Sequence, residues 1–549
     1  MNQLIGGRYL LHELLGAGGT GMVYRATDRL TGDVVALKRV RIQLDPLPPA
    51  SATDADEAEA IRLSVANEFR VLASLRHPGI IAVLDYGFDD QHQAYFTMEY
   101  LAAARTILDA GQARPLDVQL ALIMQMLEAL AYLHRHGILH RDLKPGNVLV
   151  TGDVVKLLDF GLSVSRERAA GTVGSFGYMA PEVVVGRPAG EPSDLYSVGV
   201  MAYELLAGRQ LFDTSQISRV IESILHSSPD LGALHADPAL VEVVGHLLAK
   251  DPAHRYSSAE ACITAISTAL RRAMPAETVA VRESFLRAAR FVGRRVELDS
   301  LARALDAAFA GQGSAWLVGG ESGVGKTRLL DELSTRAMVA GALLLRGQAE
   351  REGGLTYQLW REPLRRLMLT AEVSDLEAGI LQPVVPDIAT LLGREVAAAP
   401  PLEGEAGRRR LQSTMANVFC RPSAPLVLLL EDLQWATESL NVLEQLLPLV
   451  CDRPLLVVGT FRDDEAPHLP DALPGAKLIK LDRLSEGEVA DLSASMLGEV
   501  GRQAALVRLL QHESEGNTFF LIEVVRALAE QAGRLSDIGR LPLPVRVFP

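Results

Sequence analysis

The 549-residue chain has few cysteines, few aromatic residues and less positive than negative charge. Its three cysteines, Cys262, Cys420 and Cys451, are scattered without CxxC spacing, which supports neither a disulfide framework nor a zinc site and is typical of a reducing compartment. Lys and Arg number 54 against 68 Asp and Glu, a formal net charge of −14. We therefore expect no broad binding to nucleic acid or to anionic lipid.

Long hydrophobic runs are also missing. The apolar stretches "PLVLLL" near 425 and "RPLLVVGTF" near 453 are much shorter than the roughly 18–20 residues of a membrane span, and they indicate buried parallel strands instead. The start, "MNQLIGGRYLLHELL", lacks the charged region, apolar run and cleavage site of a secretory signal. The sequence therefore predicts no membrane span and a cytoplasmic location.

The first half of the chain shows strand patterns followed by helical ones. Between residues 8 and 42, short β-rich runs alternate with turn signals, as in a small antiparallel sheet. An acid- and Pro-rich insert, "LDPLPPASATDADEAEA", follows and is expected to form a loop. Helical periodicity then predicts helices over 62–76, 115–136, 193–207, 238–249 and 257–272.

The second half shows a different pattern. We place an inter-domain linker at 273–290, where no clear periodicity is present until about residue 282. Beyond it, the strand-like runs "AWLVGG", "ALLLRGQA", "PLVLLLED" and "PLLVVGTFR" are separated by helical segments, which indicates a parallel sheet with crossover helices. The predicted fold class is therefore multidomain, α+β followed by α/β.

A glycine-rich loop lies near the N-terminus. "LLGAGGTGMVYRA" has the spacing G-x-G-x-x-G-x-V, which lets a backbone approach phosphates closely while the Val covers a purine. The residues in these positions are Gly16, Gly18, Gly21 and Val23. Lys38 in "VVALK" could bind phosphate oxygens, and Glu68 on the next predicted helix is expected to orient it through an ion pair.

Two further motifs carry the groups that phosphoryl transfer needs. "HRDLKPGN" spans 140–147 and "DFG" spans 159–161. Asp142 could accept the proton of a substrate hydroxyl, and the oxygens of Asn147 and Asp159 could bind Mg²⁺ beside the nucleotide phosphates.

With these motifs, residues 8 to about 270 resemble a bacterial Hanks-type serine/threonine protein kinase. "APE" at 180–182, "DLYSVG" at 194–199 and "KDPAHR" ending at Arg255 complete the pattern. The resemblance implies a two-lobed fold within residues 1–272, with a small lobe at about 8–98, a hinge at 99–103 and a large lobe at 104–272.

The resemblance also implies residue roles. It makes Asp142 the catalytic base and gives Lys144 the role of steadying the transferred phosphate, while Lys38, oriented by Glu68, holds the nucleotide phosphates. Asp194 would anchor the catalytic loop and Glu182 would pair with Arg255. Met98 would lie behind the adenine, and the backbone from Glu99 to Leu101 would bind the base.

The segment between "DFG" and "APE" offers hydroxyls for regulation. It contains Ser163, Ser165, Thr172 and Ser175. Arg141 precedes Asp142 and could bind a phosphate on this segment, so Thr172 is the preferred phosphosite and Ser175 a second candidate. In the family, Thr is more common at the position of Ser175.

A second nucleotide motif, "GGESGVGKT", spans 319–327. It fits the phosphate-binding loop G-x-x-x-x-G-K-[ST] through Gly320, Gly325, Lys326 and Thr327, between a predicted strand and a predicted helix. About one hundred residues later, the apolar strand "PLVLLLED" ends in Glu431 and Asp432, which could bind Mg²⁺ and a water. The chain is thus expected to bind ATP at two sites.

Residues 291–545 resemble the STAND branch of AAA-like ATPases, through "FVGRRVELDSLARAL", "VVGTFRDDE" and "HESEGNTFFLIEVVRAL". The resemblance places Val292 and Gly293 near adenine, makes Arg462 a sensor of the γ-phosphate and implies self-association. Thr518 replaces the usual Pro, and Glu431 stands where Asp is common. Such proteins continue into a sensor region, so either the part that recognises a signal is absent here or the chain is a shortened version of a longer protein.

Two functions are compatible with these motifs. The leading hypothesis is a kinase that transfers the γ-phosphate of ATP to Ser or Thr of proteins, itself included, with the second nucleotide site as a regulatory switch. The alternative is a non-catalytic signalling scaffold, in which the second module assembles on ATP and the kinase fold serves for docking.

Overall fold

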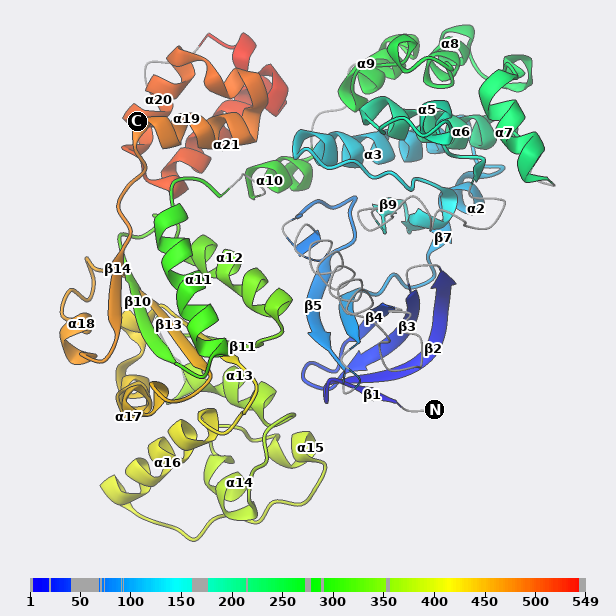
Figure 1. Cartoon of the computed structure of the whole chain (residues 1–549). Coiled ribbons are helices and arrows are strands. Elements are labelled where there is room, and N and C mark those ends of the chain that lie inside the picture. The colour runs from blue at the N-terminus through cyan, green and yellow to red at the C-terminus, as the bar shows by residue number, and fades with distance from the viewer. Residues whose placement is uncertain are drawn as a thin grey trace, which may run out of the picture.

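The computed structural model shows two bodies side by side (Figure 1). It describes residues 3–18, 21–40, 69, 72–73, 75–89, 91, 93–159, 176–213, 216–271, 278–287, 291–351 and 356–542. The acid-rich insert and most of the helix predicted at 62–76 lie outside these residues.

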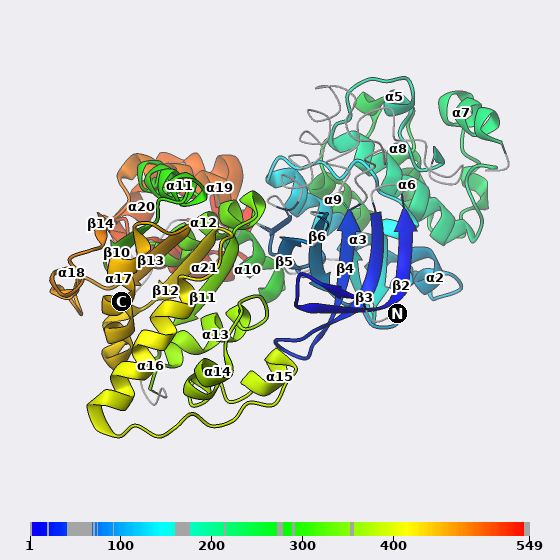
Figure 2. The same cartoon turned by 60° about the horizontal axis from the view of Figure 1, so that its bottom comes forward.

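The first body begins with a small lobe built on an antiparallel sheet. Its strands are β1 (Leu4–Ile5), β2 (Tyr9–Gly18), β3 (Gly21–Asp28), β4 (Val34–Val40), β5 (Val83–Phe88) and β6 (Ala94–Glu99). They lie in the order β1-β2-β3-β4-β6-β5, so β5 forms the edge that faces the second body (Figures 1 and 2). The strand runs predicted between 8 and 42 are confirmed.

The large lobe of the first body is mainly helical. It contains β7 (Arg105–Thr106), β8 (Val148–Thr151), β9 (Val154–Leu157), α2 (Ile107–Gly111), α3 (Leu116–Arg135), α5 (Pro181–Val184), α6 (Glu191–Ala207), α7 (Ile217–His226), α8 (Pro238–Leu247) and α9 (Ala259–Ala269). Among the described residues, α3 alone has the length and hydropathy of a membrane span, but most of it is buried, and it packs against α6 and α9.

The segment predicted to be a linker contains a packed helix. α10 (Val279–Arg287) places Phe285 against the ring of Tyr132 on α3, with ring centroids 5.1 Å apart, and beneath the guanidinium of Arg135. Its other side contacts the C-terminal helix α21 (Thr518–Ala532), where Arg526 donates to Glu283 at 2.6 and 3.0 Å. The pattern at 279–287 was missed because apolar and charged residues are mixed over only nine positions.

The second body has a parallel sheet at its centre. Its strands are β10 (Ser314–Gly319), β11 (Leu343–Gln348), β12 (Leu426–Glu431), β13 (Leu455–Phe461) and β14 (Lys477–Lys480), in the order β11-β12-β13-β10-β14. All described pairs are parallel, as the alternating pattern predicted. Only β14 was not anticipated, because it is short and mostly exposed.

Helices cover both faces of this sheet (Figure 2). Alternate residues of β12 face opposite layers, since Val427 and Leu429 pack with α11 (Arg295–Phe309) and α12 (Lys326–Ala340). Leu428 and Leu430 pack with the opposite layer. That layer contains α13 (Gln358–Leu367), α14 (Asp375–Leu381), α15 (Ile388–Leu392), α16 (Gly404–Phe419) and α17 (Leu440–Val450).

The short α18 (Leu469–Ala472) follows β13, and α19 (Glu486–Leu497), α20 (Ala504–Ser514) and α21 form a C-terminal helical group.

A buried ion pair ties the large lobe together. Arg255 donates to both carboxylate oxygens of Glu182 at 2.9 Å, and Ser193 adds a hydroxyl at 2.6 Å. The Arg255 guanidinium also donates to the backbone carbonyls of Ala249 and Pro192. The predicted pair between Glu182 and Arg255 is therefore confirmed.

Replacing Arg255 with Met should lower the free energy of unfolding by about 3–5 kcal/mol, because a buried carboxylate is left unpaired. The matched control is Arg209→Met, whose pair with Asp230 has side chains 56% and 69% exposed and should contribute less than about 1 kcal/mol. Urea unfolding followed by circular dichroism measures both, and equal destabilisation by the two changes would contradict the prediction.

Candidate nucleotide sites

The N-terminal glycine loop joins β2 to β3, as predicted. Gly18 pairs with Gly21 across the turn, while residues 19 and 20 lie outside the described part of the chain. Gly21 has φ +151°, and a Cβ there would lie 2.3 Å from the Arg39 carbonyl oxygen, so only glycine fits. Val23 is in register with Lys38 on β4, which brings the expected purine cover and the expected phosphate ligand to neighbouring positions.

Lys38 is buried and crosses to the large lobe. Its side chain is 4% exposed, and its Nζ lies 2.7 Å from Oδ1 of Asp159, at the start of "DFG". The structure therefore unites two of the predicted site residues from the two lobes. The predicted partner Glu68 lies outside the described residues.

The predicted catalytic residues gather in one loop between α3 and β8. Lys144 Nζ donates to the Asp142 carboxylate at 2.8 and 3.1 Å. Asn147 Nδ2 donates to Asp142 Oδ2 at 2.9 Å and to its backbone carbonyl at 2.8 Å. The Asp142 carboxylate thus has a fixed orientation, while its side chain remains 41% exposed and open to a substrate.

Asp194 on α6 anchors this loop through hydrogen bonds. Its two carboxylate oxygens accept the backbone N–H groups of His140 and Arg141, each at 2.9 Å, and a third bond joins it to His134. Arg141 has φ +64°, which is unfavourable for a residue with a side chain and needs such support. The anchoring contacts expected of Asp194 are present.

The predicted hinge follows β6. Met98 is buried, and the Glu99 carboxylate accepts Lys156 Nζ at 2.6 Å and the Ala82 N–H at 3.0 Å. Leu101 packs partly buried against the core of the first body. The candidate phosphosites Thr172 and Ser175, like Ser163 and Ser165, lie outside the described residues.

The second glycine loop connects β10 to α12. Gly325 caps the helix with φ +107°, and Gly320 has φ +154° with the Leu481 carbonyl oxygen 2.8 Å from where a Cβ would be. Lys326 Nζ donates to the carbonyls of Gly320 and Glu321 at 2.6 and 2.7 Å. Burial, and after it the charge of Arg462, lowers the pKa of Lys326, so a phosphate would restore a full counter-charge.

The acidic end of β12 faces this loop. Glu431 is 5% exposed and accepts the Thr327 hydroxyl at 3.0 Å, which brings the two predicted metal-binding groups together. It also accepts Arg346 Nε from β11 at 2.6 Å. Asp432 instead turns to Gln348 and Gln434, at 2.9 and 3.2 Å. Arg346 was missed because only the pairing of β11 with β12 brings it to Glu431.

Residues from beyond the sheet complete the loop's surroundings. Arg462 pairs with Glu465 at 2.7 Å and lies 4.9 Å from the centre of the Trp435 ring. Asn517 Nδ2 donates to the Ser322 carbonyl at 2.9 Å, and Thr518 Oγ1 lies 3.5 Å from the Val324 carbonyl. The start of α21 therefore rests on the phosphate-binding loop, and Asn517 is a contact that the sequence did not single out.

The oxygen donors in both sites suit Mg²⁺ bound mainly through nucleotide phosphates. Asn147 and Asp159 provide an amide and a carboxylate oxygen near Asp142, and Thr327 and Glu431 provide a hydroxyl and a carboxylate oxygen. Within the described ranges, no group of three or more His, Cys, Asp or Glu side chains is arranged around a common metal position. This small number of protein ligands is typical of Mg²⁺ that enters with a nucleotide.

Comparisons with known proteins match two parts of the chain to two families. A family model described as protein kinase domain matches residues 9–265, and one described as AAA ATPase domain matches residues 290–458. This chain joins a protein kinase domain to an AAA ATPase domain.

The curated relatives match the kinase domain. A probable serine/threonine-protein kinase of Streptomyces coelicolor is 34% identical over 272 residues, covering 47% of this chain and 39% of the relative. The serine/threonine-protein kinase PknA of Mycobacterium tuberculosis is 32% identical over 266 residues, covering 46% of this chain and 59% of PknA. The chain thus spans less than two thirds of the length of either relative.

A solved structure, the PknI kinase domain of Mycobacterium tuberculosis, is 27% identical, with a TM-score of 0.38. The match covers 49% of this chain and 98% of that structure.

Replacing Asp194 with Asn should loosen the loop around Asp142. Asn has one acceptor oxygen, so one of the two amides at His140 and Arg141 loses its charged partner, and its hydrogen exchange should accelerate about tenfold or more. Exchange mass spectrometry over residues 138–147 measures this. Asp109→Asn, on the exposed start of α2, serves as the control, and equal exchange in both variants would contradict the anchoring role.

Proposed function

We propose that the kinase domain transfers the γ-phosphate of ATP to Ser and Thr hydroxyls of proteins, including its own. The observation that carries this proposal is the Asp142 carboxylate, oriented by Lys144 and Asn147 and left open to solvent. The matches to the protein kinase model and to named serine/threonine-protein kinases support the same reaction.

In this reaction Asp142 accepts the proton of the attacking hydroxyl, and the positive charge of Lys144 stabilises the charge that develops on the transferred phosphoryl group. Lys38 binds the nucleotide phosphates after exchanging its partner Asp159 for them, while Glu68 orients it. The loop of Gly16, Gly18 and Gly21 covers the phosphates, Val23 covers the adenine, and the backbone from Glu99 to Leu101 binds it.

Asn147 and Asp159 would hold Mg²⁺ in the proposed kinase site. When bound, the ion neutralises the charge on the phosphate oxygens. Thr172 and Ser175 are the proposed targets of autophosphorylation, since the Arg141 guanidinium could bind the new phosphate. The scarcity of cysteine and the use of ATP favour the cytoplasm as the site of the reaction.

Replacing Asp142 with Asn should reduce phosphate transfer by about 10²-fold or more, because the amide cannot accept the hydroxyl proton. Radiolabelled ATP with Mg²⁺ measures incorporation into the protein and into a Ser/Thr-containing protein substrate. The control is Asp153→Asn on the exposed turn between β8 and β9, which should leave the rate unchanged. Equal labelling of Asp142→Asn and the control would indicate a non-catalytic scaffold instead.

The AAA domain is proposed to bind a second ATP as a regulatory signal, with Gly320, Gly325 and Lys326 around the phosphates. Thr327 and Glu431 would hold its Mg²⁺, with Asp432 beside them, and Arg462 would detect the γ-phosphate. This assignment is supported by the contact between Thr327 and Glu431. Because Arg346 already occupies one oxygen of Glu431, that carboxylate is poorly placed to activate water, which favours slow hydrolysis and a long-lived bound state.

Replacing Lys326 with Ala should weaken ATP binding at the second site about tenfold or more, because a charge-assisted bond to phosphate is lost. Equilibrium binding should then show one tight site in place of two, with Asp142 chemistry intact. Lys477→Ala on the exposed edge strand β14 is the control. An unchanged rate of phosphate transfer in Lys326→Ala under saturating ATP would remove support for the switch.

A further inference from the structure

The helix that begins at the second ATP site ends against the kinase domain. α12 starts with Lys326 and Thr327 of the phosphate-binding loop and runs for 15 residues, a length of about 22 Å. It is followed by Gly341, where a Cβ would lie 3.2 Å from the ring of Phe88 on β5. Met338 and Val339, in its last turn, and Phe88 itself are partly buried against one hydrophobic cluster, which contains residues of the kinase domain and of the C-terminal helices. One rigid element therefore joins the two.

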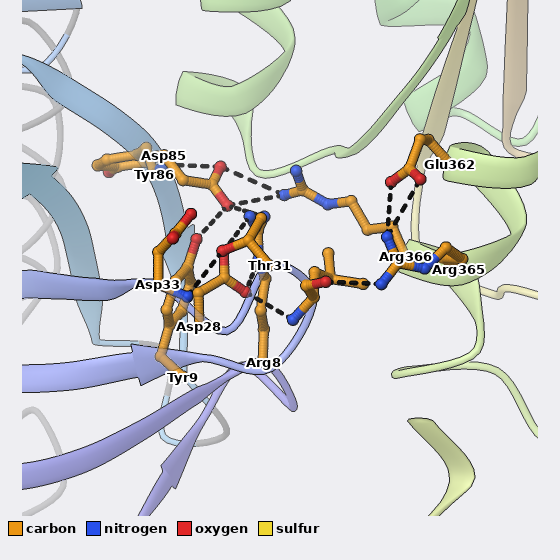
Figure 3. A network of polar contacts seen from close by, with 11 residues as sticks. Arg8, Tyr9, Asp28, Thr31, Asp33, Asp85, Tyr86, Glu362, Arg365 and Arg366 are labelled. Carbon is orange, nitrogen blue, oxygen red and sulfur yellow. Dashed lines mark hydrogen bonds and ion pairs between the residues drawn. The ribbon is translucent and has the colours of Figure 1, made fainter. Parts of the chain in front are cut away.

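The next helix of the ATPase domain adds a charged contact to the same strand (Figure 3). Arg366 on α13 donates to Asp85 of β5 at 2.9 and 3.2 Å. Asp85 is 4% exposed and also accepts Arg8 at 2.7 Å and the Tyr9 hydroxyl at 2.9 Å. Burial alone would raise the pKa of Asp85, but the two arginines and the hydroxyl hold it below its ordinary value. The carboxylate is thus charged and shared between the two domains.

Apolar and backbone contacts surround this charged group. Leu30, at the turn between β3 and β4, is buried in a cluster that otherwise belongs to the ATPase domain. Arg365 donates to the Leu30 carbonyl at 2.6 Å, and Arg29 donates to the Leu391 carbonyl at 3.0 Å. The small lobe and the ATPase domain therefore contact each other through side chains of both. We call this contact the β5 dock; it consists of the pairs Arg366–Asp85, Arg365–Leu30 and Arg29–Leu391.

The β5 dock is close to the groups of the proposed kinase site. Tyr86 follows Asp85 on β5, and its ring packs on Phe69, the residue after Glu68, with centroids 4.7 Å apart. On its other side, Tyr86 is in register with Phe96 of β6, and Phe96 is in register with Lys38 of β4. A displacement of β5 would therefore shift Lys38 through Phe96 and Phe69 through Tyr86, because packed strands and helices move as units.

We propose that the β5 dock transmits the state of the second ATP site to the kinase site, with α12 as the connecting element and the Arg366–Asp85 contact as the coupling point. The regulatory partner of the small lobe is then the ATPase domain of the same chain. A nucleotide on Lys326 and Thr327 biases the position of α12, and β5 carries the change to Lys38. The inference rests on the proposed switch and assigns its route.

The test uses the full chain and the change Arg366→Met, which keeps the apolar stem and removes the charge. The matched control is Arg409→Met on α16, whose pair with Glu405 is exposed at the surface of the ATPase domain. Hydrogen exchange over residues 83–88 should accelerate about tenfold in Arg366→Met and stay unchanged in Arg409→Met. Equal protection in both would overturn the dock as a contact in solution.

A double-mutant cycle then tests transmission. The rate of phosphate transfer is compared with and without Lys326→Ala, once in the native background and once with Arg366→Met. The fold-change caused by Lys326→Ala should disappear with Arg366→Met and persist with Arg409→Met. A fold-change of the same size in the Arg366→Met background would overturn the route while leaving the switch in place.

The outcomes separate this inference from the proposed function. If Lys326→Ala leaves the rate of phosphate transfer unchanged in the native background, both the switch and its route are wrong. If phosphate transfer persists in Asp142→Asn, the proposed kinase mechanism is wrong, while the β5 dock is tested separately by hydrogen exchange. A second variant, Phe88→Ala, removes the contact with the end of α12 without touching charge, and it should abolish the response to Lys326→Ala in the same way.

Discussion

A buried carboxylate is strongly destabilising unless a positive charge pairs with it. At two main contacts of this chain, an arginine provides that charge. Glu182 pairs with Arg255 inside the large lobe, and Asp85 pairs with Arg8 and Arg366 between the domains. Each pair requires its backbone elements to be in place, since a misplaced partner leaves an unpaired buried charge. In a chain with an excess of acidic residues, these arginines balance the buried charges of Glu182 and Asp85.

Each of the two candidate nucleotide sites contains a carboxylate, but the surroundings of the two carboxylates differ. In the kinase domain, Asp142 is bonded on one side by Lys144 and Asn147 but open on the other, which suits its proposed role as the group that accepts a proton. In the ATPase domain, Glu431 is closed in by Thr327 and Arg346. An open carboxylate suits a reaction with an incoming hydroxyl, and an enclosed one suits a nucleotide that is held. The difference lies in what surrounds each acid.

The packed helix α10 shows why the two domains form a joint structure. Its residue Phe285 lies on the kinase domain, and its Glu283 pairs with Arg526 of the C-terminal helices. Together with the β5 dock, it connects the ATPase domain to both lobes of the kinase domain. Both lobes of the kinase domain therefore contact the same neighbouring domain.

Much of this was readable in the sequence. The glycine loops, "HRDLKPGN" and the apolar strand before Glu431 are local patterns, and each predicted its strand, turn or helix because short-range sterics and periodicity dictate them. The pair of Glu182 with Arg255 followed from the family resemblance and is present. The short strand β14 and helix α10 were missed, since so few residues show no clear period.

By itself, the sequence determined the two domain types, their order and the residues that line each glycine loop. Only the tertiary structure decided that Arg346 meets Glu431, that Lys38 meets Asp159 and that Arg366 meets Asp85. These contacts join residues 85, 121 and 281 positions apart in the chain. No local pattern specifies such pairs, because they depend on how strands register and how domains pack.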